Sequence, residues 1–285
     1  MSESELIEIV AEDGIRIVAE AFGPEQGIPV LFIGGVGQTR HSWRRAAEQF
    51  AAAGYRAVLL DLRGHGDSGW SPDHIYSFAR FAADAAAIVR KLGRPTAFVG
   101  ASLGGKVGLA VAGYYGPDIA SAVVMVDTVP RNNWVSGAAQ VPAPEEGFAS
   151  LDEASQALAG HRGDTVAPGS GERLRKSMRM NENGRWHWHW DPPMMDESNG
   201  LGVMDSLDYL NGAAARTKVP VLVARAEFSQ DVDDTNLAEF RALTPQLEVE
   251  TTPGARHMLV GDQNDVFAGA AIAFLDRHLR GQARA

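Results

Sequence analysis

Hydrophobic runs and stretches of helical spacing alternate along the first half of the chain. Apolar residues at helical spacing predict a helix over Ser77–Leu92, with Gly93 as its stop. Short apolar runs that end in glycine-rich or polar turns predict strands at Pro29–Ile33, Ala57–Leu60, Thr96–Val99 and Ala122–Val126. This alternation is typical of a parallel sheet covered by helices.

The alternation fails between about residues 130 and 217, where Pro, Gly, Ser, charged and aromatic residues mix without a dominant period. It resumes with an apolar run at Val219–Ala224, a helix near Thr235–Leu243, a short strand at Leu247–Thr251 and a last helix from about Val266 to Leu279. We therefore expect one α/β core of residues 1–129 and 218–285, with a largely helical cap inserted at 130–217.

Composition narrows the chemistry. A chain of 285 residues with 45% hydrophobic content is long enough for one large core. Its formal charge of −10 argues against a nucleic-acid partner, which would need clustered Lys and Arg. The absence of cysteine excludes disulfides, thiolate zinc sites and a cysteine nucleophile. Serine, aspartate and histidine remain as the candidate catalytic residues.

The N-terminal residues are acidic and lack the cationic and apolar regions of a signal peptide. No later apolar run approaches the roughly 18 residues that a membrane-spanning helix needs. These features predict a cytoplasmic protein without a membrane partner.

The strongest chemical signal is a G-x-S-x-G motif with Ser102 at its centre. The motif follows an apolar strand and precedes the helical stretch Lys106–Tyr114. A strand that turns abruptly into a helix crowds the backbone, so side chains at Gly100 and Gly104 would collide with neighbouring elements. The turn is expected to expose the Ser102 hydroxyl, and the helix N-terminus behind it favours a developing negative charge.

Three further motifs accompany this one in order: Ile33–Gly37, Asp61–Ser68 and Gly254–His257. Together they resemble the α/β-hydrolase superfamily, over nearly all of the chain outside the cap, and specifically a serine esterase-like member with a cap insertion. The resemblance implies a mostly parallel central sheet flanked by helices. One departure is the pair Gly34-Gly35 where the family usually has His-Gly. Because that histidine generally has a structural role, the departure bears on how this loop packs more than on its chemistry.

The resemblance also implies roles for particular residues. Ser102 is the expected nucleophile, and His257, between a short strand and the last helix, is the expected general base. The backbone N–H groups of Val36 and Leu103 are the expected donors of the oxyanion hole. Related epoxide hydrolases and dehalogenases carry aspartate at the nucleophile position, so Ser102 disfavours those activities.

Two places are open for the acid that orients His257. The position that matches the family's usual aspartate, after the strand Val219–Ala224, is Ser229, with Asp231 slightly further on. The other place is Asp127, in a V-D-x-x-P sequence that resembles a subset of esterases. We favour Asp127 because an aspartate directly after an apolar strand is held rigidly, whereas Asp231 belongs to a short acidic loop. Asp231 remains the alternative.

Trp186, Trp188 and Trp190 alternate in the predicted cap, so in an extended segment they would share one face. That face either packs the cap onto the core or forms an aromatic wall around the substrate, and both roles are compatible. His187, His189 and Asp191 follow the same alternation and raise the idea of a metal site. Because no second cluster of ligands accompanies them, we predict no metal.

These observations predict a hydrolase that cleaves a carboxylic ester, lactone or thioester through an acyl-enzyme, without a cofactor. The expected partner is a small apolar or aromatic substrate, and a homodimer is left open. Two alternatives use the same fold. One is a carbon–carbon bond hydrolase or cofactor-free perhydrolase on the same triad, and the other is a ligand-binding protein that has lost turnover.

Overall fold

The computed structural model describes residues 4–131, 141–161, 169–195, 206–256 and 264–281. Its centre is an eight-stranded sheet in the order β1-β2-β4-β3-β5-β6-β9-β10. β2 pairs antiparallel with β1 and β4, and the other neighbours in this sheet pair in parallel. The strands are β1 (Glu5–Val10), β2 (Arg16–Phe22), β3 (Pro29–Ile33), β4 (Arg56–Asp61), β5 (Thr96–Ala101), β6 (Ala120–Val126), β9 (Val221–Phe228) and β10 (Leu247–Arg256).

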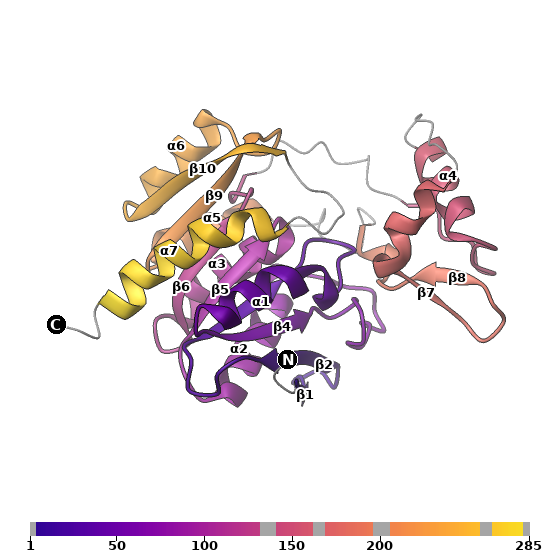
Figure 1. The fold of residues 1–285 in the computed structure, drawn as a ribbon, viewed down its shortest axis with the longest axis horizontal. Coiled ribbons are helices and arrows are strands. Elements are labelled where there is room, and N and C mark those ends of the chain that lie inside the picture. The colour runs from indigo at the N-terminus through magenta and orange to yellow at the C-terminus, as the bar shows by residue number, and fades with distance from the viewer. Residues whose placement is uncertain (1–3, 132–140, 162–168, 196–205, 257–263, 282–285) are drawn as a thin grey trace.

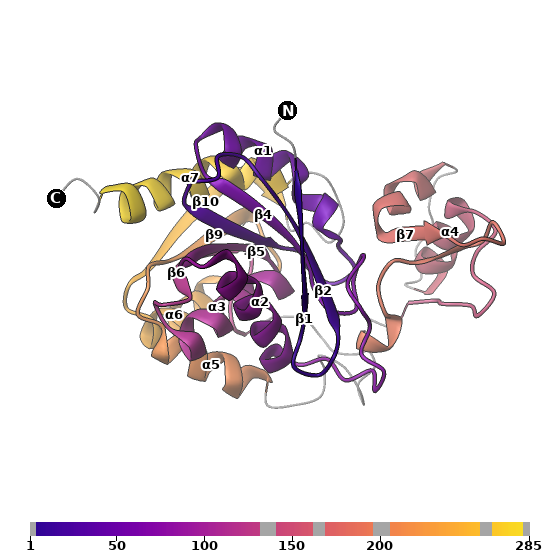
Figure 2. The same cartoon turned by 90° about the horizontal axis from the view of Figure 1, so that it is seen from below.

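Helices cover both faces of this sheet, as Figure 2 shows. One face carries α1 and α7, whose apolar residues pack with Val30, Phe32 and Val99. The opposite face carries α2, α3, α5 and α6 around a second, larger core. The helices are α1 (Arg44–Ala52), α2 (Phe78–Leu92), α3 (Leu103–Tyr115), α5 (Ser206–Arg216), α6 (Asp234–Leu243) and α7 (Ala268–Leu275). Short turns flank them: η1 (Arg40–Trp43), η4 (Asn264–Phe267) and the π-helical η5 (Asp276–Arg280).

A smaller unit stands beside the sheet, with α4, β7 and β8 grouped together in both views (Figure 1). Its elements are α4 (Leu151–His161), η2 (Ser170–Ser177), the two-stranded sheet β7 (Met178–Met180) and β8 (Trp186–Trp188), and η3 (Pro192–Met195). Helix α5, by contrast, packs on α3: a Cβ atom added to Gly113 would lie 2.3 Å from the carbonyl oxygen of Ala213. We call residues 141–195 the cap; the division at 130 and 217 stays a prediction.

The sheet covered by helices that the hydrophobic pattern predicts is confirmed. Helix α2 has the expected ends, since the Ser77 hydroxyl accepts a hydrogen bond from the Arg80 N–H and Gly93 adopts a left-handed conformation with φ 73°. The sequence analysis missed the β1–β2 hairpin, although apolar residues lie on both sides of its Asp13-Gly14 turn. Within the described residues, no helix combines the length and the apolar character needed to cross a membrane.

Candidate active site

Ser102 lies at the sharp turn between β5 and α3. Its backbone has φ 48° and ψ −114°, which a residue with a side chain rarely adopts. Gly100 and Gly104, on either side of Ser102, leave room for the backbone of this turn. A Cβ atom on Gly100 would lie 2.2 Å from the carbonyl carbon of Gly104, and one on Gly104 would lie 2.1 Å from the carbonyl oxygen of Ile33. The structure therefore contains the strained strand-to-helix turn that the motif predicts.

Asp127 leaves the sheet beside Ser102. Ala101 and Val126, the residues directly before them, are register partners on β5 and β6. Asp127 also has a positive φ, 48°, and is only 3% exposed. Its Oδ1 accepts a hydrogen bond of 2.9 Å from the N–H of Ala226, and its own N–H donates to the carbonyl of Ala224 at 2.8 Å. The third strand, β9, thus fixes the carboxylate at the carboxyl edge of the sheet.

Asp231 lies in the loop between β9 and α6. This loop is ordered by its own hydrogen bonds: the Ser229 hydroxyl accepts from the N–H of Val232 at 3.0 Å, and the Asn236 amide donates to the Asp231 carbonyl at 2.7 Å. Asp233 caps α6 through a reciprocal pair of bonds with Asn236. The side chains of Ser229 and Asp233 therefore form hydrogen bonds that stabilise this loop and the start of α6.

Lys106, in the first turns of α3, is buried within electrostatic range of Asp231. Only 6% of this residue is exposed, and burial lowers the pKa of its ammonium to about 7, although the nearby charge of Asp231 acts in the opposite direction. The one sign of this buried charge in the sequence is a lysine inside the apolar stretch that follows Ser102. The charge of Asp231 therefore acts on a buried lysine whose proton is weakly held.

The loop after β3, residues 34–38, runs beside Ser102, and we call it the oxyanion loop. A Cβ atom on Gly35 would lie 3.5 Å from the Cβ of Ser102. The Gln38 side chain braces the loop by accepting the Gly35 N–H at 2.9 Å, and it leaves no room for a side chain at Gly34, where a Cβ would lie 2.9 Å from the Cβ of Gln38. This contact accounts for the glycine at position 34.

The two expected oxyanion donors flank the serine. Val36 belongs to the oxyanion loop, and Leu103 is the first residue of α3, directly after Ser102. A donor in the first turn of a helix keeps its N–H free of partners within that helix. Their joint action on a substrate oxygen stays a prediction.

His65 holds the oxyanion loop through a hydrogen bond to Gly37. Its ring is fully buried, and burial lowers its pKa to about 4, so the ring is neutral at pH 7. The Nε2 atom accepts a hydrogen bond of 3.0 Å from the Gly37 N–H, and Nδ1 donates to the Arg63 carbonyl at 3.2 Å. Because a protonated ring has no acceptor nitrogen, this support requires neutral His65.

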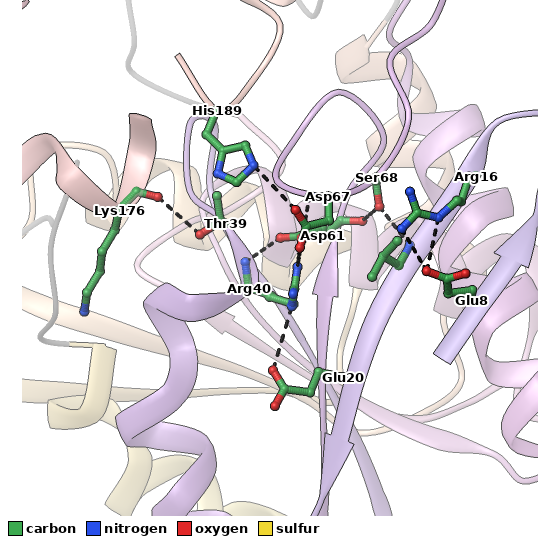
Figure 3. Close-up of polar contacts among 11 residues, drawn as sticks. Glu8, Arg16, Glu20, Thr39, Arg40, Asp61, Asp67, Ser68, Lys176 and His189 are labelled. Atoms are coloured by element: carbon green, nitrogen blue, oxygen red, sulfur yellow. Dashed lines mark hydrogen bonds and ion pairs between the residues drawn. The ribbon is translucent and has the colours of Figure 1, made fainter. Parts of the chain in front are cut away.

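Buried charges anchor the Asp61–Ser68 motif (Figure 3). Asp61 accepts hydrogen bonds from the backbone N–H of Arg40 at 2.6 Å and of Asp67 at 3.0 Å, and it forms an ion pair with the Arg40 guanidinium. The Ser68 hydroxyl donates to the Asp61 carbonyl at 2.6 Å. The motif therefore holds the start of η1, directly after the oxyanion loop, against the end of β4.

The three tryptophans of the cap differ in their surroundings. Trp186 and Trp188 lie on β8, where Trp186 is half-buried and Trp188 is buried with its Nε1–H donating to the Pro142 carbonyl at 2.8 Å. Trp190 follows β8 and is buried against Gly37 and His65. Trp190 therefore makes the contact between cap and core that the packing interpretation expects. A substrate-binding role for these residues stays a prediction.

The side chains of the suggested metal motif have separate partners. His187 contacts Asn181, His189 lies 3.7 Å from an oxygen of Asp67, and Asp191 accepts from Tyr76 and His74. Among the residues that the structure describes, no group of three or more His, Cys, Asp or Glu side chains is gathered in a way that could hold a metal ion.

His257, the expected base, lies outside the described residues. The strand before it is described: β10 ends at Arg256, whose register partner is Phe228 at the end of β9. The chain thus reaches the carboxyl edge of the sheet, where Ser102 and Asp127 lie, directly before position 257. The role of His257 stays a prediction.

Comparisons with known proteins agree with this architecture. A family model described as alpha/beta hydrolase fold matches residues 28–263. Esterase Rv0045c of Mycobacterium tuberculosis is 27% identical, over 82% of this chain and 78% of the relative. The 2-(acetamidomethylene)succinate hydrolase of Mesorhizobium japonicum is 28% identical, over 78% of this chain and 79% of the relative.

A solved structure extends the likeness to the whole fold. The crystal structure of E-2-(acetamidomethylene)succinate hydrolase superposes with a TM-score of 0.74 at 23% identity, covering 98% of this chain and all of the other. The family model spans most of the chain, and the sheet order, the strained Ser102 turn and the helices on both faces fit the same architecture. The chain belongs to the α/β-hydrolase fold family.

Proposed function

We propose that this chain is a serine hydrolase that cleaves carboxylic esters, with Ser102 as nucleophile, His257 as general base and Asp127 as the orienting acid. The observation that carries the proposal is the strained Ser102 turn with the buried Asp127 carboxylate leaving the adjacent strand beside it. The similarity to Esterase Rv0045c supports the ester as substrate class.

The proposed reaction has two acyl-transfer steps. His257 takes the proton of the Ser102 hydroxyl while its oxygen attacks the ester carbonyl, and the Val36 and Leu103 N–H groups stabilise the tetrahedral oxyanion. His257 then gives the proton to the departing alkoxide, which leaves as the alcohol. Water repeats the sequence on the acyl-enzyme and releases the carboxylic acid. Asp127 stabilises the imidazolium and selects the correct tautomer of His257.

Asp127 is preferred over Asp231 on three counts. Its carboxylate is buried and bonded to β9, it lies next to Ser102 in the sheet register, and its backbone has the same positive φ as that of Ser102. Asp231 belongs instead to a loop after β9 that is held by its own hydrogen bonds. The cap tryptophans, of which Trp186 is the most accessible, are proposed to contact an apolar or aromatic part of the substrate.

Other reactions on the same triad remain alternatives. A carbon–carbon bond hydrolase or a perhydrolase would use the same serine, and relatives named 2-(acetamidomethylene)succinate hydrolase and non-heme chloroperoxidase show that the family is chemically diverse. A ligand-binding protein without turnover is the alternative from another class. It predicts saturable binding with no covalent or hydrolytic step.

The test is intact-mass analysis after treatment with a fluorophosphonate, combined with turnover of p-nitrophenyl acetate. We expect one adduct on the wild type, none on Ser102→Ala, and loss of ester turnover in the variant. Ser121→Ala is the matched control, because its hydroxyl is buried on β6 without a hydrogen-bond partner in the described part of the chain. It should be labelled like the wild type. A wild type that is neither labelled nor active would contradict the proposal.

A further inference from the structure

His74 is the third strained residue of the molecule. Within the described residues, the non-glycine positions with positive φ are Ser102, Asp127 and His74, the last with φ 52°. Such conformations persist only where the surrounding structure holds them, and they cluster at functional sites. The Nδ1 atom of His74 donates a hydrogen bond of 2.8 Å to Oδ2 of Asp191. The strained backbone of His74 therefore places its ring in contact with Asp191.

Asp191 is a buried cap residue held by the core. It is 1% exposed, and its Oδ2 also accepts a hydrogen bond of 2.6 Å from the Tyr76 hydroxyl. Burial and the adjacent carboxylate raise the pKa of Tyr76, so this hydroxyl keeps its proton and remains a donor. The backbone N–H of Asp191 donates to the Gly64 carbonyl at 2.8 Å. The backbone of Asp191 is thus fixed to the Asp61–Ser68 motif, and its side chain to Tyr76 and His74.

The preceding residue, Trp190, lies directly on the oxyanion loop. It is 4% exposed, and its Nε1 would lie 3.3 Å from a Cβ atom placed on Gly37. Its ring stacks with the ring of His65, with 6.4 Å between centroids and 17° between planes. Since His65 accepts the Gly37 N–H, Trp190 and His65 contact the loop at the residue that follows Val36.

Further contacts seat the same stretch of the cap on the core. The His189 carbonyl accepts the Gly66 N–H at 2.8 Å. Figure 3 shows two more links: the His189 ring points toward Asp67, 3.7 Å away, and the Thr39 hydroxyl donates to the Lys176 carbonyl at 3.3 Å. The cap therefore contacts the core on both sides of the oxyanion loop, at the Asp61–Ser68 motif and at Thr39.

We infer that Asp191, gripped by Tyr76 and His74, is a positioning residue that keeps Trp190 seated on Gly37 and thereby fixes the oxyanion loop for catalysis. The inference rests on the proposed function, in which Val36 donates to the oxyanion. It gives the cap a role in turnover beyond enclosing the substrate. Displacing the loop by about 1 Å would weaken a contact that matters most in the transition state, so kcat falls while substrate binding changes little.

The experiment compares two tyrosines that make the same kind of bond. Tyr76→Phe removes the hydroxyl that donates to Asp191. Tyr55→Phe is the matched control, because Tyr55 is equally buried and its hydroxyl donates to Asp276 at 2.7 Å, in the core formed with α1 and α7. Asp191→Ala removes the acceptor, and Asp191→Asn restores an acceptor oxygen. The readouts are kcat and KM for p-nitrophenyl acetate, the rate of labelling by a fluorophosphonate, and Tm.

We expect Tyr76→Phe to lower kcat about five-fold or more with KM within two-fold, and to slow labelling to a similar extent. Tyr55→Phe should leave both rates unchanged, and its effect on Tm should be smaller because the Asp276 side chain is 43% exposed. Asp191→Ala should lose more activity than Tyr76→Phe, and Asp191→Asn should recover part of it.

Equal effects of Tyr76→Phe and Tyr55→Phe on the rates, or a change confined to KM, would overturn the inference while leaving the proposed function intact. A wild type that is neither labelled at Ser102 nor active on the ester would overturn the proposed function, and this inference with it.

Discussion

Ser102 and Asp127 leave neighbouring parallel strands at the same level and with the same unusual backbone angle. Their predecessors, Ala101 and Val126, are paired in register, and both residues have φ 48°. The Ser102 N–H also reaches the Val126 carbonyl at 3.4 Å. Each position costs on the order of 1–3 kcal/mol of backbone strain, which the surrounding sheet must hold. Two strained residues side by side at the carboxyl edge of the sheet support the proposal that the reaction centre lies at this edge.

The first prediction separates the two candidate acids. Asp127→Asn should reduce kcat for p-nitrophenyl acetate by roughly 10²–10⁴-fold, because the amide favours the wrong tautomer of His257 and cannot stabilise the imidazolium. Asp231→Asn should keep most of its turnover, since Asp231 lies in a loop held by its own hydrogen bonds and not at the end of a strand beside Ser102. Steady-state kinetics of both variants, with circular dichroism to check folding, makes the comparison. The reverse ranking would assign the acid to Asp231.

Local patterns were sufficient to predict much of this site. The G-x-S-x-G motif between an apolar run and a helical stretch locates Ser102, and the position of Asp127 after an apolar run places it at the end of a strand. Both inferences need only residues close together in sequence. The hairpin of β1 and β2 was not predicted because Leu6 and Val10 place apolar residues on the exposed face of β1. The sequence of β1 therefore does not alternate between apolar and polar residues.

Contacts between distant segments could not be predicted in this way. Trp190 contacts Gly37, and Asp191 contacts Tyr76, across more than a hundred residues. The alternating tryptophans indicated a shared face, but the surface that this face contacts depends on how the cap folds back. Gln38 bracing Gly35 is a local contact, yet a glutamine side chain in a loop carries no recognisable signal.

The second prediction concerns acid sensitivity. Burial lowers the pKa of His65 to about 4 in the folded chain, from an ordinary value of 6.5. Between these values the unfolded chain binds one more proton, so the free energy of unfolding falls as the pH drops from about 6.5 to about 4. Protonation would also break the acceptor contact with the Gly37 N–H.

Urea unfolding of the wild type and His65→Gln between pH 7 and pH 4.5 provides the measurement. We expect the wild type to lose stability more steeply, by up to about 1.4 kcal/mol per pH unit relative to the variant. Parallel pH profiles would show that His65 does not titrate as its burial implies.

The third prediction tests the space at the nucleophile turn. Gly104→Ala should destabilise the fold by about 1–3 kcal/mol or more, because its Cβ would meet the backbone of Ile33, which cannot rotate away. Gly269→Ala is the matched control. It lies in α7, and a Cβ there would meet none of the residues that the structure describes within 4 Å, so the change should raise stability by about 0.5–1 kcal/mol. Thermal unfolding of both variants gives the comparison, and a Gly104→Ala protein as stable as the wild type would contradict the prediction.

The last prediction follows from the buried Lys106. Its pKa is lowered from 10.5 to about 7 by burial, with Asp231 opposing the shift. Between about pH 7 and pH 10.5 the unfolded chain holds a proton that the folded chain has lost, so this residue makes stability rise with pH across that window. Below pH 7 the folded chain carries the buried charge, and the full cost of burying it lowers the free energy of unfolding.

Lys106→Met removes the charge and keeps a flexible apolar side chain of similar length, so it should stabilise the protein most at low and neutral pH. Urea unfolding at pH 6, 7, 8 and 9 should show a gap in favour of the variant that narrows as pH rises. A gap that stays constant would mean that Lys106 keeps its proton throughout, held by Asp231 more strongly than burial disfavours the charge.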